Sequence, residues 1–97
     1  MSYPVILPNA HIYEAIADER ARQERKFLHT CASPDFKAFT HFGRVTVLGE
    51  EFGEVCRAAL DVDKGDHPNT ARAKLRDELI QTAAVAVAYI EALDATP

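Results

Sequence analysis

Three carboxylates that could do chemistry stand within five residues of an otherwise apolar segment: Glu50, Glu51 and Glu54. Like charges at this spacing repel one another, so solvent or a cation must offset the repulsion. On a helix, Glu51 and Glu54 lie one turn apart and can present oxygens to one hard cation such as Mg²⁺. A solvated, ion-paired helix face is the alternative, because Arg57 follows Glu54 by three residues.

A second polar group interrupts a long apolar segment near the C-terminus and contains Asp77, Glu78 and Gln81. Glu78 and Gln81 are again one helical turn apart, so two antiparallel helices could bring this pair opposite the first. A cage of four residues from two helices is a recurrent way to hold a divalent metal in a helical bundle. The surface alternative stays open here too, because Lys74 stands four residues before Glu78 and could pair with it.

Two helices are expected before the second polar group. Asn9 is expected to cap the first, which runs to about residue 28 and whose four basic residues point in different directions. That spread favours a solvated face over a phosphate clamp. Ser33, followed by Pro and Asp, has the composition of a helix start, so the second helix is expected to begin between residues 33 and 40 and to end near Asp61. Its apolar stripe is expected to contain Leu48, Phe52, Val55 and Ala59.

The third helix is expected to follow a loop over residues 63–69, with Asn69 or Thr70 as its cap, and to end near Asp94. Its main apolar stripe is expected to contain Leu75, Leu79, Ala83, Ala86, Ile90 and Leu93. Other apolar residues wrap round the helix, and three helices of this length cannot cover them all. We therefore expect a second subunit, with Val85 on the side that it covers.

The composition is that of one all-α domain spanning residues 1–97, with residues 1–8 as an extended lead-in. No segment alternates with the period of a strand. The net charge of −4, with scattered basic residues, argues against binding to a nucleic acid polymer. No signal peptide is expected, and the longest apolar run, residues 82–90, is too short to span a membrane. The two cysteines, Cys31 and Cys56, are expected to be free thiols in a cytoplasmic protein.

The two polar groups together resemble a known signature. Glu51-x-x-Glu54, then 23 residues, then Glu78-x-x-Gln81 is similar to the E-x-x-E…E-x-x-D pattern of the all-α nucleoside triphosphate pyrophosphohydrolases, the MazG-like superfamily. The resemblance covers roughly residues 14 to 94. It is closest to the small MazG-like proteins of phages and bacteria in three segments: residues 19–23, 48–55 and 79–88.

The resemblance implies a helical bundle of three main antiparallel helices, completed by oligomerisation as a homodimer or homotetramer. It implies hydrolysis of a nucleoside triphosphate to the monophosphate and pyrophosphate with Mg²⁺, or Mn²⁺, as the cofactor. It places metal ligands at Glu51, Glu54, Glu78 and Gln81. Glu50 matches the extra acid that often precedes the ligands in the family. Phosphoanhydride hydrolysis also needs a positioned water, and an acid outside the ligand set, Glu50 or Asp77, is expected to orient it.

Gln81 departs from the family pattern, which has Asp at that position. An amide offers one carbonyl oxygen without charge, so one metal ligand is weaker than in the pattern. Two other functions therefore remain open. The chain could be a degenerate member of the superfamily that binds nucleotide or metal without turnover. It could also be a helical protein-interaction module whose glutamates form a solvated face.

Overall fold

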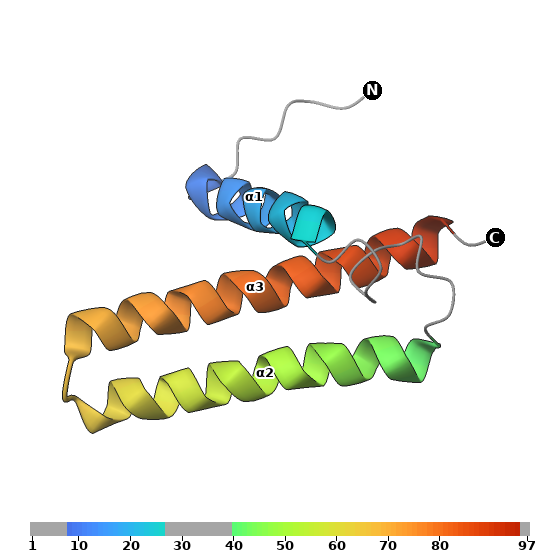
Figure 1. Ribbon diagram of the computed structural model, residues 1–97. Coiled ribbons are helices and arrows are strands. Elements are labelled where there is room, and N and C mark those ends of the chain that lie inside the picture. Colours follow the sequence, from blue (N-terminus) through green and yellow to red (C-terminus); the bar gives the residue numbers. More distant parts are fainter. Residues whose placement is uncertain (1–7, 27–39, 96–97) are drawn as a thin grey trace.

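The computed structural model describes residues 8–26 and 40–95, and these form three helices. They are α1 (Ala10–Lys26), α2 (His41–Lys64) and α3 (Pro68–Ala95). Helices α2 and α3 lie side by side as an antiparallel hairpin, and α1 crosses α3 on the side away from α2 (Figure 1). The two described stretches contain no strand, which confirms the predicted all-α class there. Helix α3 contacts both of the others, so it positions the rest.

Helix α2 begins with Thr40 as its N-cap. The Thr40 backbone is extended, with φ −75° and ψ 170°, and its hydroxyl oxygen accepts a hydrogen bond from the Gly43 N–H at 3.1 Å. This satisfies one of the backbone donors that a helix start leaves free. The predicted start between residues 33 and 40 includes this position, whereas the Ser33 cap itself lies outside the described residues.

The connection between α2 and α3 is shorter than predicted. Helix α2 continues to Lys64 and ends where Gly65 adopts φ 77°, with its N–H donating to the Val62 carbonyl at 3.1 Å. Glycine takes this left-handed conformation without a steric cost, so it stops the helix at once. Helix α3 then starts at Pro68, whose ring presets a helical φ. The predicted end at Asp61 is therefore three residues too early, and the predicted caps Asn69 and Thr70 are two or three residues too late.

Helix α1 starts one residue after Asn9, close to the predicted position. Asn9 has φ 61°, in the left-handed region, and its carbonyl accepts a hydrogen bond from the Ile12 N–H at 2.9 Å. An N-cap usually has extended backbone, so Asn9 begins the first turn through its carbonyl group with a different geometry from the one expected. The predicted end near residue 28 lies outside the described residues.

The apolar core consists of small side chains, and the predicted stripes are wrong in part. Its buried members are Ala58, Ala84, Val85, Ala88 and Ala92. Larger residues of the predicted stripes are about half exposed: Phe52 (60%), Leu79 (51%), Ile90 (57%) and Leu93 (49%). Val85, expected at a subunit contact, is 8% exposed within its own chain. The reason is steric, because alanines let helix axes approach more closely than leucines do. Helices α2 and α3 therefore turn small residues inward and leave several large ones exposed.

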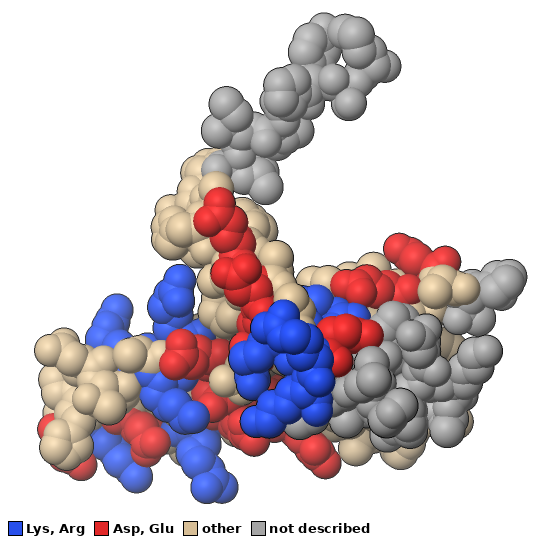
Figure 2. Space-filling model, turned by 45° about the horizontal axis from the view of Figure 1, so that its top comes forward, with Lys and Arg blue, Asp and Glu red and all other residues tan. Residues whose placement is uncertain are grey.

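No described helix is both long enough and apolar enough for a membrane span. On the face seen in Figure 2, acidic and basic side chains of the described residues are intermixed. A polyanion such as a nucleic acid would favour a stretch of one sign, which this face does not present.

Candidate metal centre

The antiparallel pairing of α2 and α3 brings three glutamates together. One carboxylate oxygen each from Glu51, Glu54 and Glu78 lies within 4.8 Å of the other two. The first two come from successive turns of α2, and the third comes from the facing side of α3. These three are called the Glu cluster below. Three of the four residues predicted as metal ligands therefore converge in the structure.

Two oxygens of the Glu cluster are buried without a partner. Glu78 is 3% exposed, and although its Oε1 accepts a hydrogen bond from Lys74 Nζ at 2.7 Å, its Oε2 has no hydrogen-bond partner. Glu51 is half-buried, and its Oε2 also lacks a partner. Leaving a polar group buried and unpaired costs about 1–3 kcal/mol, and more when the group is charged. A cation between the carboxylates would satisfy both oxygens at once.

The pKa values of the Glu cluster move in opposite directions. Burial raises the pKa of Glu51, and the charges of Glu54, Glu78, Glu19 and Glu50 raise it further. The pKa of Glu54 is raised because its neutral form can donate a hydrogen bond to Glu78 and its ionised form is repelled by that carboxylate. The pKa of Glu78 is lowered, chiefly because the Lys74 ammonium donates a hydrogen bond to it. Burial and repulsion therefore disfavour the ionised forms of Glu51 and Glu54, whereas Lys74 stabilises the ionised form of Glu78.

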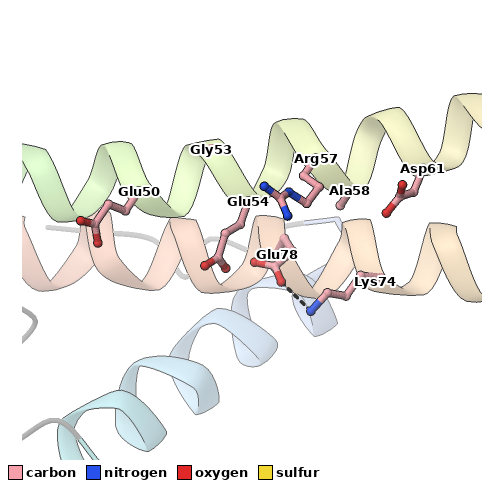
Figure 3. A pocket seen from close by; sticks show the side chains of 8 residues that line it. All are labelled: Glu50, Gly53, Glu54, Arg57, Ala58, Asp61, Lys74 and Glu78. Atoms are coloured by element: carbon pink, nitrogen blue, oxygen red, sulfur yellow. Dashed lines mark ion pairs between the residues drawn. The ribbon is translucent and has the colours of Figure 1, made fainter.

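A groove beside the Glu cluster runs between α2 and α3 and has a volume of about 640 Å³ (Figure 3). Its lining residues are Glu50, Gly53, Glu54, Arg57, Ala58, Asp61, Lys74 and Glu78. Gly53 and Ala58 have little or no side chain to fill it. Two cationic side chains, Arg57 and Lys74, line the groove together with the carboxylates. This combination of acids and bases suits a ligand that carries a metal ion and phosphate groups together.

The remaining predicted site residues lie at different places. Glu50 is exposed and lines the groove. Asp77 is exposed and does not line it. Gln81 is half-buried one turn beyond Glu78, and its backbone carbonyl accepts a hydrogen bond from Gln23 Nε2 at 3.3 Å. Of the two acids expected to orient a water, only Glu50 is therefore at the groove.

Helix α1 contributes two residues, Glu19 and Gln23, that were not among the predicted site residues although they lie in the segment 19–23 that resembles MazG-like proteins. Glu19 is among the charges that raise the pKa of Glu51, so α1 approaches the Glu cluster electrostatically. The Glu19 carboxylate accepts hydrogen bonds from Arg22 at 2.8 Å and from Gln23 at 3.1 Å. Gln23 is 4% exposed, and its Oε1 is buried without a partner. No periodic pattern marks these residues, because only the crossing of α1 over α3 brings them near.

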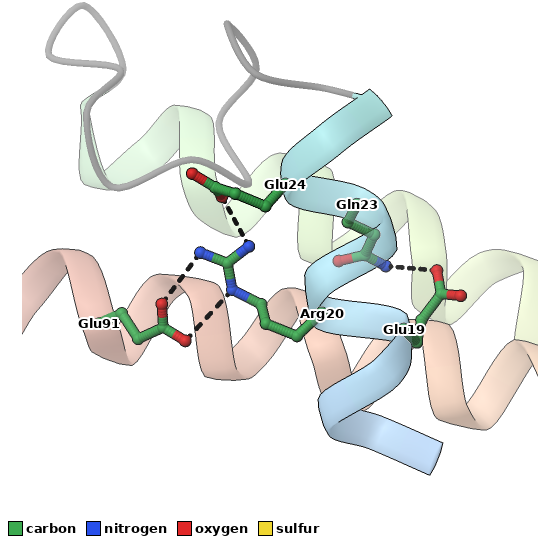
Figure 4. Close-up of polar contacts among 5 residues, drawn as sticks. All are labelled: Glu19, Arg20, Gln23, Glu24 and Glu91. Atoms are coloured by element: carbon green, nitrogen blue, oxygen red, sulfur yellow. Dashed lines mark hydrogen bonds and ion pairs between the residues drawn. The ribbon is translucent and has the colours of Figure 1, made fainter. Parts of the chain in front are cut away.

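Arg20 anchors α1 to α3. Its guanidinium donates to Glu91 at 3.2 and 2.9 Å and to Glu24 at 2.7 Å (Figure 4). Arg20 is 9% exposed, so the expectation that the basic residues of the first helix form a solvated face is wrong for this one. A guanidinium held by two carboxylates positions a helix and is not available to a phosphate.

Comparison with known proteins gives no match: no family model fits the chain, and neither a curated protein nor a solved structure is significantly similar to it.

Proposed function

We propose that this chain is a Mg²⁺-dependent nucleoside triphosphate pyrophosphohydrolase, which releases pyrophosphate and a nucleoside monophosphate. One observation carries the proposal: three carboxylates from two helices converge, and two of their oxygens are buried without a partner. The groove beside them is lined by two cations. A solvated surface patch has no reason to bury carboxylate oxygens without partners. The similarity of the two acidic motifs to the MazG-like signature supports the same activity.

The charge balance favours a divalent ion. Glu51, Glu54 and Glu78 carry three negative charges, and Lys74 offsets one of them, which leaves an excess of two. Carboxylate oxygens suit hard cations, and Mg²⁺ usually combines a few carboxylates with phosphate oxygens of the substrate. Mn²⁺ accepts the same ligands. The Glu cluster would hold such an ion, which would neutralise the charge that develops on the phosphate oxygens.

The chain's own residues would supply the other requirements of the reaction. Arg57 and Lys74 would bind phosphate oxygens, because both line the groove beside the Glu cluster. Glu50, an acid at the groove outside the cluster, would orient the attacking water, since a carboxylate can accept a hydrogen bond from it. Asp77 is less suited to this role because it does not line the groove. Gln81 could support a ligand through its amide.

The proposed enzyme is a homodimer or a pair of such dimers, because α2 carries an apolar seam that the other described helices leave exposed. The seam repeats at intervals of three and four residues, as in coiled coils: Phe42, Val45, Gly49, Phe52 and Cys56. All five are exposed, and a Cβ built on Gly49 would meet no atom within 4 Å. In an antiparallel pair of α2 helices, Phe52 would face Gly49 of the partner subunit, and Val45 would face Cys56 of the partner subunit. The large Phe52 ring then meets a glycine, which leaves room for it.

A panel of nucleoside triphosphates with Mg²⁺ or Mn²⁺, assayed for pyrophosphate release, tests the activity. We expect release from at least one substrate, its loss in Glu54→Gln and its retention in Glu14→Gln, an exposed glutamate of α1. Metal binding without release from any substrate would identify a degenerate member that binds without turnover. Absence of both metal binding and release would favour a protein-interaction module, for which the open apolar face would be the docking surface.

A further inference from the structure

Lys74 reaches into the Glu cluster from the solvent side. Its side chain is 62% exposed, whereas the Glu78 side chain that it contacts, one helical turn further along α3, is 3% exposed. The Nζ to Oε1 distance is 2.7 Å, and within the described residues this is the one ion pair recorded for the three carboxylates of the cluster. A lysine ammonium is a compact charge on a flexible chain, so it can make and leave such a contact readily.

The contact competes with a metal ion. A divalent cation among the three carboxylates would lie at the unpartnered Oε2 of Glu78, while the ammonium contacts Oε1 of the same carboxylate. Two cations at one carboxylate repel each other. Without a metal, the ammonium reduces the cost of burying Glu78. When a metal ion is bound, the ion offsets the charge of Glu78 in place of Lys74. The Lys74 ammonium then needs another partner.

Such a partner would lie in the groove between α2 and α3. Lys74 and Arg57 both line it; in Figure 3 the Arg57 guanidinium lies level with Glu78, and Lys74 lies on the side toward the α2–α3 connection. Asp61 lines the same end, but it pairs with Lys64 at 3.7 Å, which partly offsets its charge. Phosphate oxygens placed here would meet two cations within reach of a metal in the cluster.

We propose that Lys74 is an exchangeable counter-cation, which pairs with Glu78 in the metal-free protein and moves to a phosphate oxygen when a divalent ion and a polyphosphate bind together. This deepens the proposed function and depends on it. It directs the polyphosphate chain from the Glu cluster toward Arg57 and the α2–α3 connection. Lys74 is thus a phosphate-binding residue whose contact in the metal-free protein opposes metal binding.

Calorimetric titration with two probes tests this exchange: Mg²⁺ alone, and tripolyphosphate in the presence of saturating Mg²⁺. Lys74→Met removes the charge but keeps the length of the side chain. We expect it to bind Mg²⁺ at least threefold more tightly and tripolyphosphate at least fivefold more weakly. Lys74→Arg should retain most of the tripolyphosphate affinity. Arg76→Met, an exposed residue two positions along α3 and on another side of the helix, makes the same change in net charge and should alter neither affinity by more than twofold.

Opposite effects on the two affinities are what a surface ion pair would not produce. Unchanged affinities in Lys74→Met, or effects equal to those of Arg76→Met, would overturn the proposal about Lys74. The proposed pyrophosphohydrolase function would still stand. Weaker Mg²⁺ binding in Lys74→Met would also overturn it, because the lysine would then be holding Glu78 in place for the metal. If the unaltered protein binds no Mg²⁺, the proposed function and this inference both fail. Circular dichroism of each variant confirms that it is folded.

Discussion

Replacing Glu51 with glutamine should stabilise the protein without metal and destabilise it with metal. The pKa of Glu51 is raised by burial and by the neighbouring carboxylates, so the fold favours its neutral form. The stabilisation from a raised pKa is present below the pKa of the unfolded chain, about 4.3 for glutamate, and is lost as the pH rises through the folded value. At neutral pH, Glu51 is therefore an ionised group in an unfavourable place unless a cation is bound.

The size of the effect follows from the contacts of Glu51. Repulsion between like charges one helical turn apart costs about 0.2–0.5 kcal/mol, and a buried polar atom without a partner costs about 1–3 kcal/mol. A glutamine amide could donate a hydrogen bond to Glu54 or Glu78. We expect Glu51→Gln to raise the free energy of unfolding by about 1 kcal/mol in EDTA. For a domain of this size, that corresponds to a rise in Tm of about 4–8 °C.

Mg²⁺ should reverse which of the two proteins, unaltered or Glu51→Gln, has the larger free energy of unfolding. A ligand at 100 times its dissociation constant stabilises the native state by about 2.7 kcal/mol. The unaltered protein should gain this amount, and Glu51→Gln should lose most of it, because an amide oxygen binds a hard cation more weakly than a carboxylate does. With saturating Mg²⁺, the unaltered protein should therefore be the more stable by about 1–2 kcal/mol, as the difference of these two effects.

Urea or thermal unfolding followed by circular dichroism, in EDTA and in Mg²⁺, measures both effects. In EDTA the advantage of Glu51→Gln should shrink as the pH falls through the raised pKa of Glu51 and then below the unfolded value of about 4.3, where the glutamate becomes protonated in both states. Glu14→Gln, on an exposed side of α1, should show no reversal between EDTA and Mg²⁺. Equal stabilisation of the unaltered protein and Glu51→Gln by Mg²⁺ would show that Glu51 is not a ligand. A less stable Glu51→Gln in EDTA would show that its carboxylate is a structural group.

Four further outcomes are expected. Glu54→Gln should abolish Mg²⁺-dependent pyrophosphate release while its circular dichroism stays helical, because it removes a ligand from the surface of α2; unfolding of this variant would make the carboxylate structural. Gln81→Asp should tighten Mg²⁺ binding in calorimetry by less than tenfold, because a new charge one turn from Glu78 adds repulsion; tenfold tighter binding with faster hydrolysis would refute this. Phe52→Lys should yield a monomer in sedimentation at micromolar concentration, and a monomeric unaltered protein would remove the proposed seam. Arg20→Met should lower the free energy of unfolding in urea by about 2 kcal/mol, because it breaks charged hydrogen bonds between α1 and α3; a loss below about 0.5 kcal/mol would mean that apolar packing alone holds α1.

The convergence of the Glu cluster was predictable because it depends on helical spacing and on the antiparallel pairing of two helices. Glu51 and Glu54 share one side of a helix, and an antiparallel neighbour with an acid at the same level completes the group. The helix ends were less predictable. Gly65 and Pro68 were both visible as loop residues, but each can end or begin a helix as well as lie in a loop. Only the local backbone, with φ 77° at Gly65, decides between the two.

The inward face of α3 was mispredicted because the most hydrophobic side chains and the side chains small enough for close helix packing lie on different faces of the helix. Leu79 and Ile90 dominate a hydrophobic pattern, yet the close helix contacts in this chain use Ala84 and Ala88, which are 0% exposed. A pattern that weights residues by hydrophobicity favours the larger side chains. It cannot tell a face that packs within the chain from one that is left open for a partner.

Burial, and not the number of acids, distinguishes the Glu cluster from the ion pairs of Arg20. In both places Arg20 or Lys74 contacts carboxylates. Around Arg20, the side chains of Glu24 and Glu91 are 33% and 44% exposed, so water solvates the excess negative charge and the arrangement is complete as it stands. In the Glu cluster, Glu78 is 3% exposed and buried oxygens of Glu51 and Glu78 have no partner, so water cannot do the same. A folded chain keeps such an imbalance only at a cost, and a divalent ion that binds there removes the cost together with the charge.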